Sequence, residues 1–167
     1  MLNEVLLQEA SSKTNADQAY YLILNKIITA EMEPGSLIQE PVLMEKLDLG
    51  RTPIREALKR LETQGFVTVS PRRGMFVTPI TMKDINWIYE IRMELESLAM
   101  RLAAERIKRK QLEALQQQVD YYKNKKKRTA EESVLLDREF HFTVYQATQN
   151  QLLFNDLQRY YYLSQRI

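Results

Sequence analysis

Cysteine is absent from the 167 residues, glycine occurs only four times and proline only five times. Without cysteine the chain can form neither a disulfide nor a thiolate metal site, which fits a reducing cytoplasm. No run of about 18 apolar residues occurs, so no membrane-spanning helix is expected. The N-terminal segment MLNEVLLQEA is acidic and lacks the basic start and apolar core of a secretory signal peptide. We therefore expect a cytoplasmic protein that does not contact membranes.

The charges of the chain nearly balance, at a net of +2, but the basic residues are unevenly distributed. Between Gly50 and Met75, six basic side chains are accompanied by only two acidic ones. A basic segment within a near-neutral region concentrates positive potential where phosphate groups can bind. The distribution of charge, rather than its total, therefore points to nucleic acid.

Glycine and proline divide the first half of the chain into short elements. Apolar residues spaced three and four apart predict a helix over 15–32, and the segment Glu33–Ser36 then has the Pro-Gly order of a type II turn. A shorter helix is expected over 41–47. A third is expected over 52–64, capped by Thr52 and followed by a left-handed glycine.

Beyond that glycine the pattern changes from helical to extended. Two β-prone runs, 66–69 and 75–77, surround a turn over 70–74 and predict a hairpin. Two closely joined helices followed by a hairpin are the order of a winged helix-turn-helix, in which the second helix enters the major groove of DNA. We therefore predict such a domain, with three helices and a β-hairpin wing, over residues 13–80.

Basic and hydroxyl side chains lie where such a domain would meet DNA. Arg51 and Arg55, at the start of the predicted recognition helix, can each form two parallel hydrogen bonds to guanine, and Thr52 suits a phosphate at the helix N-terminus. In the wing, Gly74 lacks a side chain, so its backbone can approach DNA closely. The alternative for each arginine is a solvated charge on an exposed surface. The predicted DNA-binding set is Arg51, Thr52, Arg55, Lys59, Arg72, Arg73 and Gly74.

The second half of the chain, 81–167, is expected to be entirely helical. Apolar stripes predict helices over 81–107, through Leu112–Tyr122, over 129–148, and from about Asn150 to the end of the chain. Capping-box signals mark the starts of the first and third of these helices. We therefore assign the chain to the mainly α class, with the winged helix-turn-helix followed by an all-α antiparallel helical bundle.

The segment RTPIREALKRLETQGF, residues 51–66, resembles the signature of GntR-family regulators, and RGMFV, residues 73–77, resembles their wing. The resemblance spans roughly 16–80. It implies contacts to operator DNA from Arg51, Thr52, Arg55 and Gly74. Two residues depart from the family pattern, since Gly50 stands where serine is usual and Asp48 where glycine is usual. Because Gly50 has no hydroxyl to cap the helix or contact phosphate, we expect some loss of DNA affinity but no change of fold.

Residues 81–167 resemble the start of the all-helical FCD effector domain, which follows this type of DNA module in one large GntR subgroup. The resemblance rests on IRMELE, residues 91–96, and on DREFHF, residues 137–142. It implies a small-molecule effector that carries a carboxylate, for which Arg92 is the candidate binding residue. An exposed ion pair between Arg92 and Glu96, four positions on, is the alternative.

Asp137 and His141 lie four positions apart, so they share one helix face and could together bind a divalent metal. Family members with a metal add two histidines from later helices, whereas this chain has a single histidine. We therefore expect a domain that is incomplete at its C-terminal end and has no certain cofactor, although Zn, Ni or Mn could bind in a complete domain. The alternatives are a natural variant whose pocket works without metal, and a simple polar pair between the two side chains.

These features together predict a DNA-binding transcriptional regulator, a repressor or an activator, rather than an enzyme. We expect a homodimer that binds palindromic double-stranded operator DNA and responds to a small-molecule effector. A metal-dependent hydrolytic enzyme built on Asp137 and His141 is one alternative, and it would need three ligands and an open position. The other alternative is a helical interaction module without DNA function, and the retained basic residues argue against it.

Overall fold

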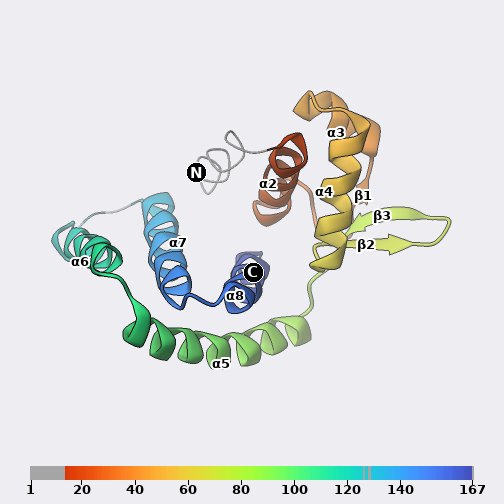
Figure 1. Ribbon diagram of the computed structural model, residues 1–167. Helices are drawn as coiled ribbons and strands as arrows, with labels where there is room; N and C mark the ends of the chain where they lie inside the picture. Colours follow the sequence, from red (N-terminus) through yellow and green to blue (C-terminus); the bar gives the residue numbers. More distant parts are fainter. Residues whose placement is uncertain (1–13, 126, 128, 167) are drawn as a thin grey trace. The chain divides into compact units, whose positions relative to one another are not determined.

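The computed structural model describes residues 14–125, 127 and 129–166. They form two compact units, of which one extends to Ile85 and the other from Asn86 to Ser164. Figure 1 shows helices through most of the chain and one small sheet among the described residues, so the mainly α class is confirmed. None of the helices in the described part is long and apolar enough to cross a membrane. The N-terminal segment MLNEVLLQEA and residue 13, where the predicted first domain begins, lie outside the described residues.

Three helices form the core of the first unit. α2 spans Asn15–Ile28, α3 spans Glu40–Leu47 and α4 spans Arg51–Thr63. The apolar positions of α4 recur at intervals of three and four, so they share one face, which packs against α2 and α3. The buried residues of this face are Ile54, Ala57, Leu58 and Leu61.

A three-stranded antiparallel sheet completes this unit, with β1 at Leu37–Ile38, β2 at Val67–Ser70 and β3 at Gly74–Val77. The strand order is β1-β3-β2. β2 and β3 form the predicted hairpin, with Ser70 opposite Gly74. β1 was not predicted, because its two residues carry no local strand signal and pair with β3 far along the chain. The winged helix-turn-helix is confirmed, with one strand more than the sequence indicated.

The first helix ends four residues earlier than predicted. α2 stops at Ile28 rather than residue 32 because Ala30 adopts a left-handed conformation, with φ of 56°. The backbone N–H of Met32 then donates to the carbonyl of Lys26 at 2.9 Å, which satisfies one of the last helical carbonyls. The type II turn that follows is confirmed, since Gly35 has φ of 80° and Ser36 donates to the Glu33 carbonyl.

The start of α4 also differs from the prediction. Gly50, with extended backbone angles, is the N-cap residue, so Thr52 lies inside the first turn instead of capping the helix. Pro53 still falls within the first turn, where its missing N–H removes no intrahelical hydrogen bond. Because glycine has no side chain, no side-chain hydrogen bond caps this helix end. The predicted left-handed residue after the helix is Gly65, with φ of 84°.

The second unit is built from helices. α5 spans Met82–Arg106, α6 Arg109–Asn124, α7 Ala130–Ala147 and α8 Gln151–Ser164 (Figure 1). Both predicted capping boxes are present, because Thr81 and Asp84 exchange hydrogen bonds before α5 and Thr129 and Glu132 do so before α7. α8 ends at Ser164, so the predicted continuation of this helix to the last residue is wrong.

α7 is the centre of the second unit and packs against α6 and α8. Phe142 of α7 makes edge-to-face ring contacts with Tyr161 and Tyr162 of α8, both of which are buried. α6 has the apolar stripe that predicted it but does not bury this stripe. It has no buried residue, and Leu112 of its stripe is exposed.

Candidate functional site

Two arginines of the predicted recognition helix share one carboxylate. Arg55 Nε lies 2.9 Å from Oε2 of Glu40, at the start of α3, and Arg51 Nε lies 3.9 Å from the same oxygen. The arginine side chains are 58% and 67% exposed, whereas Glu40 is 20% exposed. Glu40 was not predicted as a site residue, and its only signal in the sequence is its place as an acidic residue in the first turn of α3. The pair of guanidinium groups is thus held loosely at the surface.

Four predicted DNA-binding residues lie on one face of α4. Arg51, Arg55 and Lys59 follow one another at intervals of four, and Thr52 lies beside them. All four are exposed, on a face of the helix adjacent to its buried face. Arg60 belongs to the same basic segment but points elsewhere, because it pairs with Asp17 of α2 at 3.1 Å. The exposed cationic face of α4 therefore holds fewer charges than the sequence segment does.

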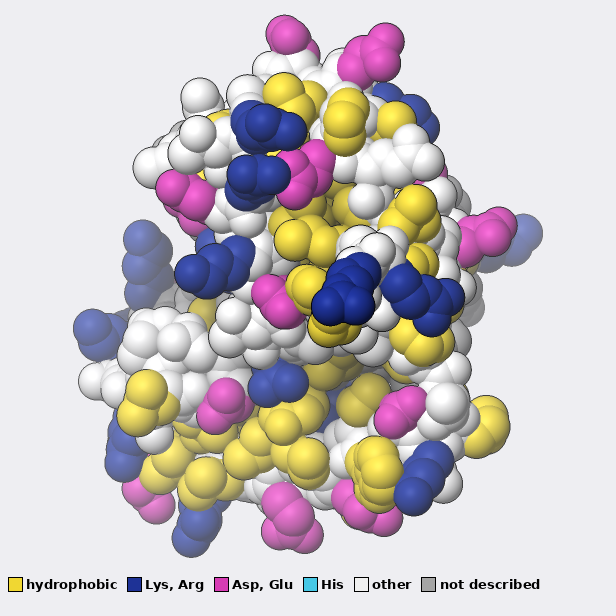
Figure 2. Space-filling view, turned by 90° about the vertical axis from the view of Figure 1, so that its right-hand side faces the viewer, with side chains coloured by type: hydrophobic (Ala, Val, Ile, Leu, Met, Phe, Trp, Pro, Cys, Tyr) yellow, Lys and Arg dark blue, Asp and Glu magenta, His cyan; other side chains and the backbone are white. Residues whose placement is uncertain are grey.

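The wing places its arginines beside a glycine that the fold itself requires. Gly74 has φ of 111°, and a Cβ there would lie 3.0 Å from Cδ1 of Leu37 in β1. The glycine therefore has a structural reason apart from the predicted close approach to DNA. Arg72 and Arg73 are both exposed at the turn of the hairpin. Figure 2 shows the side toward which the wing points in Figure 1, and there Lys and Arg side chains are interspersed with acidic ones.

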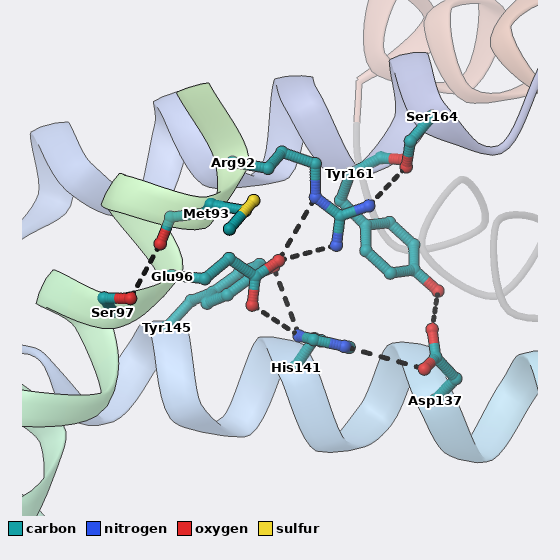
Figure 3. A network of polar contacts seen from close by, with 9 residues as sticks. All are labelled: Arg92, Met93, Glu96, Ser97, Asp137, His141, Tyr145, Tyr161 and Ser164. Carbon is teal, nitrogen blue, oxygen red and sulfur yellow. Dashed lines mark hydrogen bonds and ion pairs between the residues drawn. The ribbon is translucent and has the colours of Figure 1, made fainter. Parts of the chain in front are cut away.

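A second cluster of charged side chains joins α5, α7 and α8 around Glu96 (Figure 3). Arg92 Nη2 lies 2.6 Å from Oε1 of Glu96, and its Nη1 donates to Oγ of Ser164 at 2.6 Å. His141 Nδ1 lies 3.0 Å from Oε2 of Glu96. The hydroxyl of Tyr145 also donates to Oε1 of Glu96, at 2.8 Å. Both oxygens of one carboxylate are thus engaged by cations.

Asp137 completes this cluster at the other ring nitrogen of the histidine. Its Oδ1 lies 3.5 Å from Nε2 of His141, and its Oδ2 accepts a hydrogen bond from Tyr161 at 3.0 Å. The predicted pairing of Asp137 and His141 along one helix face is therefore seen, together with a second carboxylate that was not predicted. Arg92 pairs with Glu96 in the manner of the alternative interpretation, but its side chain is only 14% exposed.

The surroundings shift the ionisation of both partners at the centre of the cluster. Burial alone would lower the pKa of His141, but hydrogen bonds to Asp137 and Glu96 outweigh it and raise the pKa to about 9. Burial alone would raise the pKa of Glu96, but hydrogen bonds from His141, Arg92 and Tyr145 outweigh it and lower the pKa to about 2. At neutral pH the cluster therefore contains two cations and two anions.

Comparison with known proteins now identifies both units. The profile of "Bacterial regulatory proteins, gntR family" matches residues 15–77, and that of the "FCD domain" matches residues 87–167. The chain belongs to the GntR family. Its first unit carries the GntR winged helix-turn-helix, and its second unit carries the FCD domain.

Curated relatives of this GntR-family chain are transcriptional regulators by name. The "Nta operon transcriptional regulator" of Aminobacter aminovorans is 34% identical over 126 residues, which are 75% of this chain and 60% of that protein. The "HTH-type transcriptional regulator McbR" of Escherichia coli is 30% identical over 115 residues, which are 68% of this chain and 52% of that protein. The chain therefore spans between half and three fifths of the length of these two relatives.

Solved structures confirm the fold of the GntR-family chain. The structure of "E. coli McbR/YncC" superimposes with a TM-score of 0.76 over 92% of this chain and 73% of that one, at 24% identity. The structure of a GntR regulator from Rhodococcus sp. RHA1 gives a TM-score of 0.58 at 21% identity. At these identities the likeness establishes the winged helix-turn-helix and the helical FCD fold alone.

The described residues of the FCD domain do not by themselves make the metal site that the resemblance implies. The two ring nitrogens of His141 face the carboxylates of two different residues, Nδ1 that of Glu96 and Nε2 that of Asp137. Across 14–125, 127 and 129–166, no group of three His, Cys, Asp or Glu side chains could hold a metal ion. Single Asp and His ligands bind first-row metals weakly.

Proposed function

We propose that this chain is a sequence-specific DNA-binding transcriptional regulator that acts in the cytoplasm. The observation that carries the proposal is the exposed face of α4, where Arg51, Thr52 and Arg55 lie in the N-terminal half of the recognition helix and Lys59 follows one turn later. Recognition helices meet base edges with their N-terminal residues. Because its relatives are named as transcriptional regulators, we propose no catalytic activity.

The roles of the DNA-binding side chains follow from their chemistry. Arg51 and Arg55 are proposed to bind guanine edges, because guanidinium matches the O6 and N7 acceptors of that base. Thr52 and Lys59 are proposed to bind phosphate, Thr52 beside the amide groups of the first helical turn. The wing is proposed to bind phosphates of the neighbouring DNA backbone through Arg72, Arg73 and Gly74.

A dimer is the proposed active form. Two-fold dimers of helix-turn-helix proteins bind palindromic sites whose half-sites lie about one helical turn apart. One α4 from each protomer would then occupy successive major grooves on the same side of the duplex.

The FCD domain is proposed to bind a small carboxylate effector at Arg92. The guanidinium of this residue and the imidazole of His141 both contact Glu96, so two cations converge on one carboxylate position. Ser164 accepts a further hydrogen bond from the guanidinium. Planar bidentate pairing makes arginine a preferred partner of carboxylates. No metal is required for this interaction.

Selection of binding sites from a random pool of duplex DNA tests the proposal. The full chain, at low salt, is expected to enrich an inverted repeat with guanine in each half-site. The double variant Arg51→Ala/Arg55→Ala is the control, because both side chains are exposed and their removal leaves the buried face of α4 intact. It should keep the helical circular dichroism of the parent and enrich no sequence. Failure of the parent chain to enrich any sequence would overturn the proposed function.

A further inference from the structure

Glu96 has the surroundings of a bound carboxylate ligand. Its two oxygens receive Nε and Nη2 of Arg92 at 3.2 and 2.6 Å, the hydroxyl of Tyr145 at 2.8 Å and Nδ1 of His141 at 3.0 Å. Figure 3 shows these donors converging on the one side chain from α5 and α7. A small carboxylate recognised by this domain would need the same kind of donors, namely a guanidinium fork and further charge-assisted hydrogen bonds.

We propose that Glu96 is an internal carboxylate which occupies the anion-binding position of the FCD domain, and that an effector carboxylate binds by displacing it. The inference rests on the proposed effector function and specifies how binding at that site is controlled. Glu96 is thereby a residue that sets ligand affinity and specificity.

Charge balance makes displacement necessary. Arg92 and His141 supply two positive charges, and Glu96 and Asp137 supply two negative charges, so the cluster is neutral as it stands. If a ligand carboxylate bound while Glu96 stayed in place, it would lie next to the carboxylate of Glu96. It would then add an unpaired negative charge in partly buried surroundings. The side chain of Glu96 is 20% exposed, so it can reach water by a change of rotamer once its donors are taken.

Displacement has a consequence for the ligand. The affinity of any anion for this site is reduced by the free energy needed to separate Glu96 from its donors, in the same way that a minor binding-competent state reduces apparent affinity. A monocarboxylate offers only what Glu96 already provides. A ligand with a second carboxylate or other polar groups offers more, so the internal carboxylate selects against simple anions.

Removal of the internal carboxylate gives a direct test with formate as the probe. Glu96→Ala should leave a carboxylate-sized vacancy beside Arg92 and His141. Sodium formate is then expected to raise the thermal midpoint of Glu96→Ala with saturation in the millimolar range, whereas sodium chloride at equal ionic strength does not. The parent chain and Glu94→Ala, which removes an exposed carboxylate two positions away on the same helix, should respond equally to both salts.

Two further variants keep the test decisive. Adding Arg92→Ala to Glu96→Ala should abolish the formate response, because the guanidinium is the main donor. If Glu96→Ala does not fold, Glu96→Gln retains the size of the side chain with a weaker, neutral acceptor. Calorimetry should then give Glu96→Gln an affinity for succinate at least about tenfold above that of the parent, since about 1.4 kcal/mol of pairing lost by Glu96 corresponds to a factor of ten.

The outcomes separate this inference from the proposed function. A folded Glu96→Ala protein that responds identically to formate and chloride would overturn it, and so would a Glu96→Gln protein that binds succinate no better than the parent. Enrichment of an operator by the parent chain alongside either result would leave DNA recognition standing. A formate response without any enriched operator would support the internal carboxylate and remove the proposed function.

Discussion

The chain contains two clusters in which one glutamate pairs with two cations, and they differ in their exposure to water. In the winged helix-turn-helix, Glu40 pairs with arginines that are more than half exposed. In the FCD domain, Glu96 pairs with Arg92 and His141, whose side chains are only 14% and 20% exposed. Exposed ion pairs contribute roughly 0–1 kcal/mol, whereas loss of one partner from a buried pair costs about 3–5 kcal/mol.

The difference in exposure separates two ways of using the same chemistry. Guanidinium groups that keep most of their water can exchange Glu40 for phosphate or guanine with little change in protein stability. Guanidinium and imidazolium groups that are partly enclosed contribute to the stability of their own domain, so a ligand must compete with that contribution. The first cluster suits frequent binding and release, and the second suits a response to one class of ligand.

The largest effect expected is the salt dependence of DNA binding by the exposed cluster. With about 6–10 phosphate contacts, affinity for a selected operator should fall by ~10³–10⁵ between about 50 and 200 mM salt, because released counterions drive the binding. Fluorescence anisotropy across a series of KCl concentrations measures the slope. The thermal midpoint of the protein over the same series is the control and should change little. An operator affinity that does not change with salt concentration would contradict the proposal that the exposed cluster binds DNA through phosphate contacts.

The enclosed cluster should make the stability of the FCD domain depend on pH. His141 has a pKa raised from 6.5 to about 9, so its contribution, up to about 3 kcal/mol, is complete below pH 6.5 and is lost as pH rises through 9. Glu96 has a pKa lowered from 4.5 to about 2, so its contribution is complete above pH 4.5 and is lost as pH falls through 2. The two pKa shifts arise from the same ion pair, so their contributions to the stability of the domain do not add.

Nuclear magnetic resonance can measure the pKa of His141 directly, because the chain has a single histidine. Urea unfolding between pH 5 and 10 should show the alkaline loss in the parent and a smaller one in His141→Asn. A titration midpoint of the imidazole near its ordinary value of about 6.5 would show that the cluster is open to solvent like that of Glu40.

Variants of single exposed arginines should distinguish base contacts from phosphate contacts in the winged helix-turn-helix. Arg55→Ala is expected to weaken operator binding by about 1–3 kcal/mol while sparing non-specific DNA, because it removes a base contact. Arg73→Ala on the wing should weaken binding to both DNAs more evenly and flatten the salt slope, because it removes a phosphate contact. Equal losses on both DNAs for Arg55→Ala would reassign this side chain to phosphate.

The smallest effect is expected from the carboxylate of the exposed cluster. Glu40→Gln should change the free energy of unfolding by less than about 1 kcal/mol, since the pair is solvated. Its affinity for non-specific duplex DNA should rise a few-fold, because both arginines lose the anion that holds them. Glu45→Gln, an exposed position on the same helix with the same change of charge, is the matched control. A fall in non-specific affinity of Glu40→Gln alone would show that Glu40 positions the arginines for DNA.

The sequence predicted features whose signals are local. The order of helices and the hairpin were correct, as were the caps at Thr81 and Thr129, because propensity, spacing and capping act within a few residues. β1 was missed because two residues carry no periodic pattern and gain their structure only from pairing with β3. Helix ends moved by up to four residues where a left-handed residue such as Ala30 intervened.

Local sequence signals predicted the two candidate sites less completely than the fold. The candidate residues could be named from motif and residue type, and Asp137 with His141 could be paired by spacing along one helix. The partners that determine their state could not be named. Glu40 meets Arg55 across α3 and α4, and Glu96 meets His141 across α5 and α7, so both contacts depend on helix packing. The apolar stripe of α6 likewise gave no information about whether it would be buried.

The pairing of β1 with β3 has a mechanical consequence for operator choice. β3 is hydrogen-bonded to β1 and also to the turn that precedes β1, at Gly35 and Ser36. β1 in turn leads directly into α3. The wing therefore cannot pivot independently of the helices, so the spacing between wing and recognition helix is set within the protein. Any mismatch with the duplex must be taken up by bending the DNA or changing its groove width, at an energy that depends on base sequence. Bases that this domain never touches would then influence which operators it prefers.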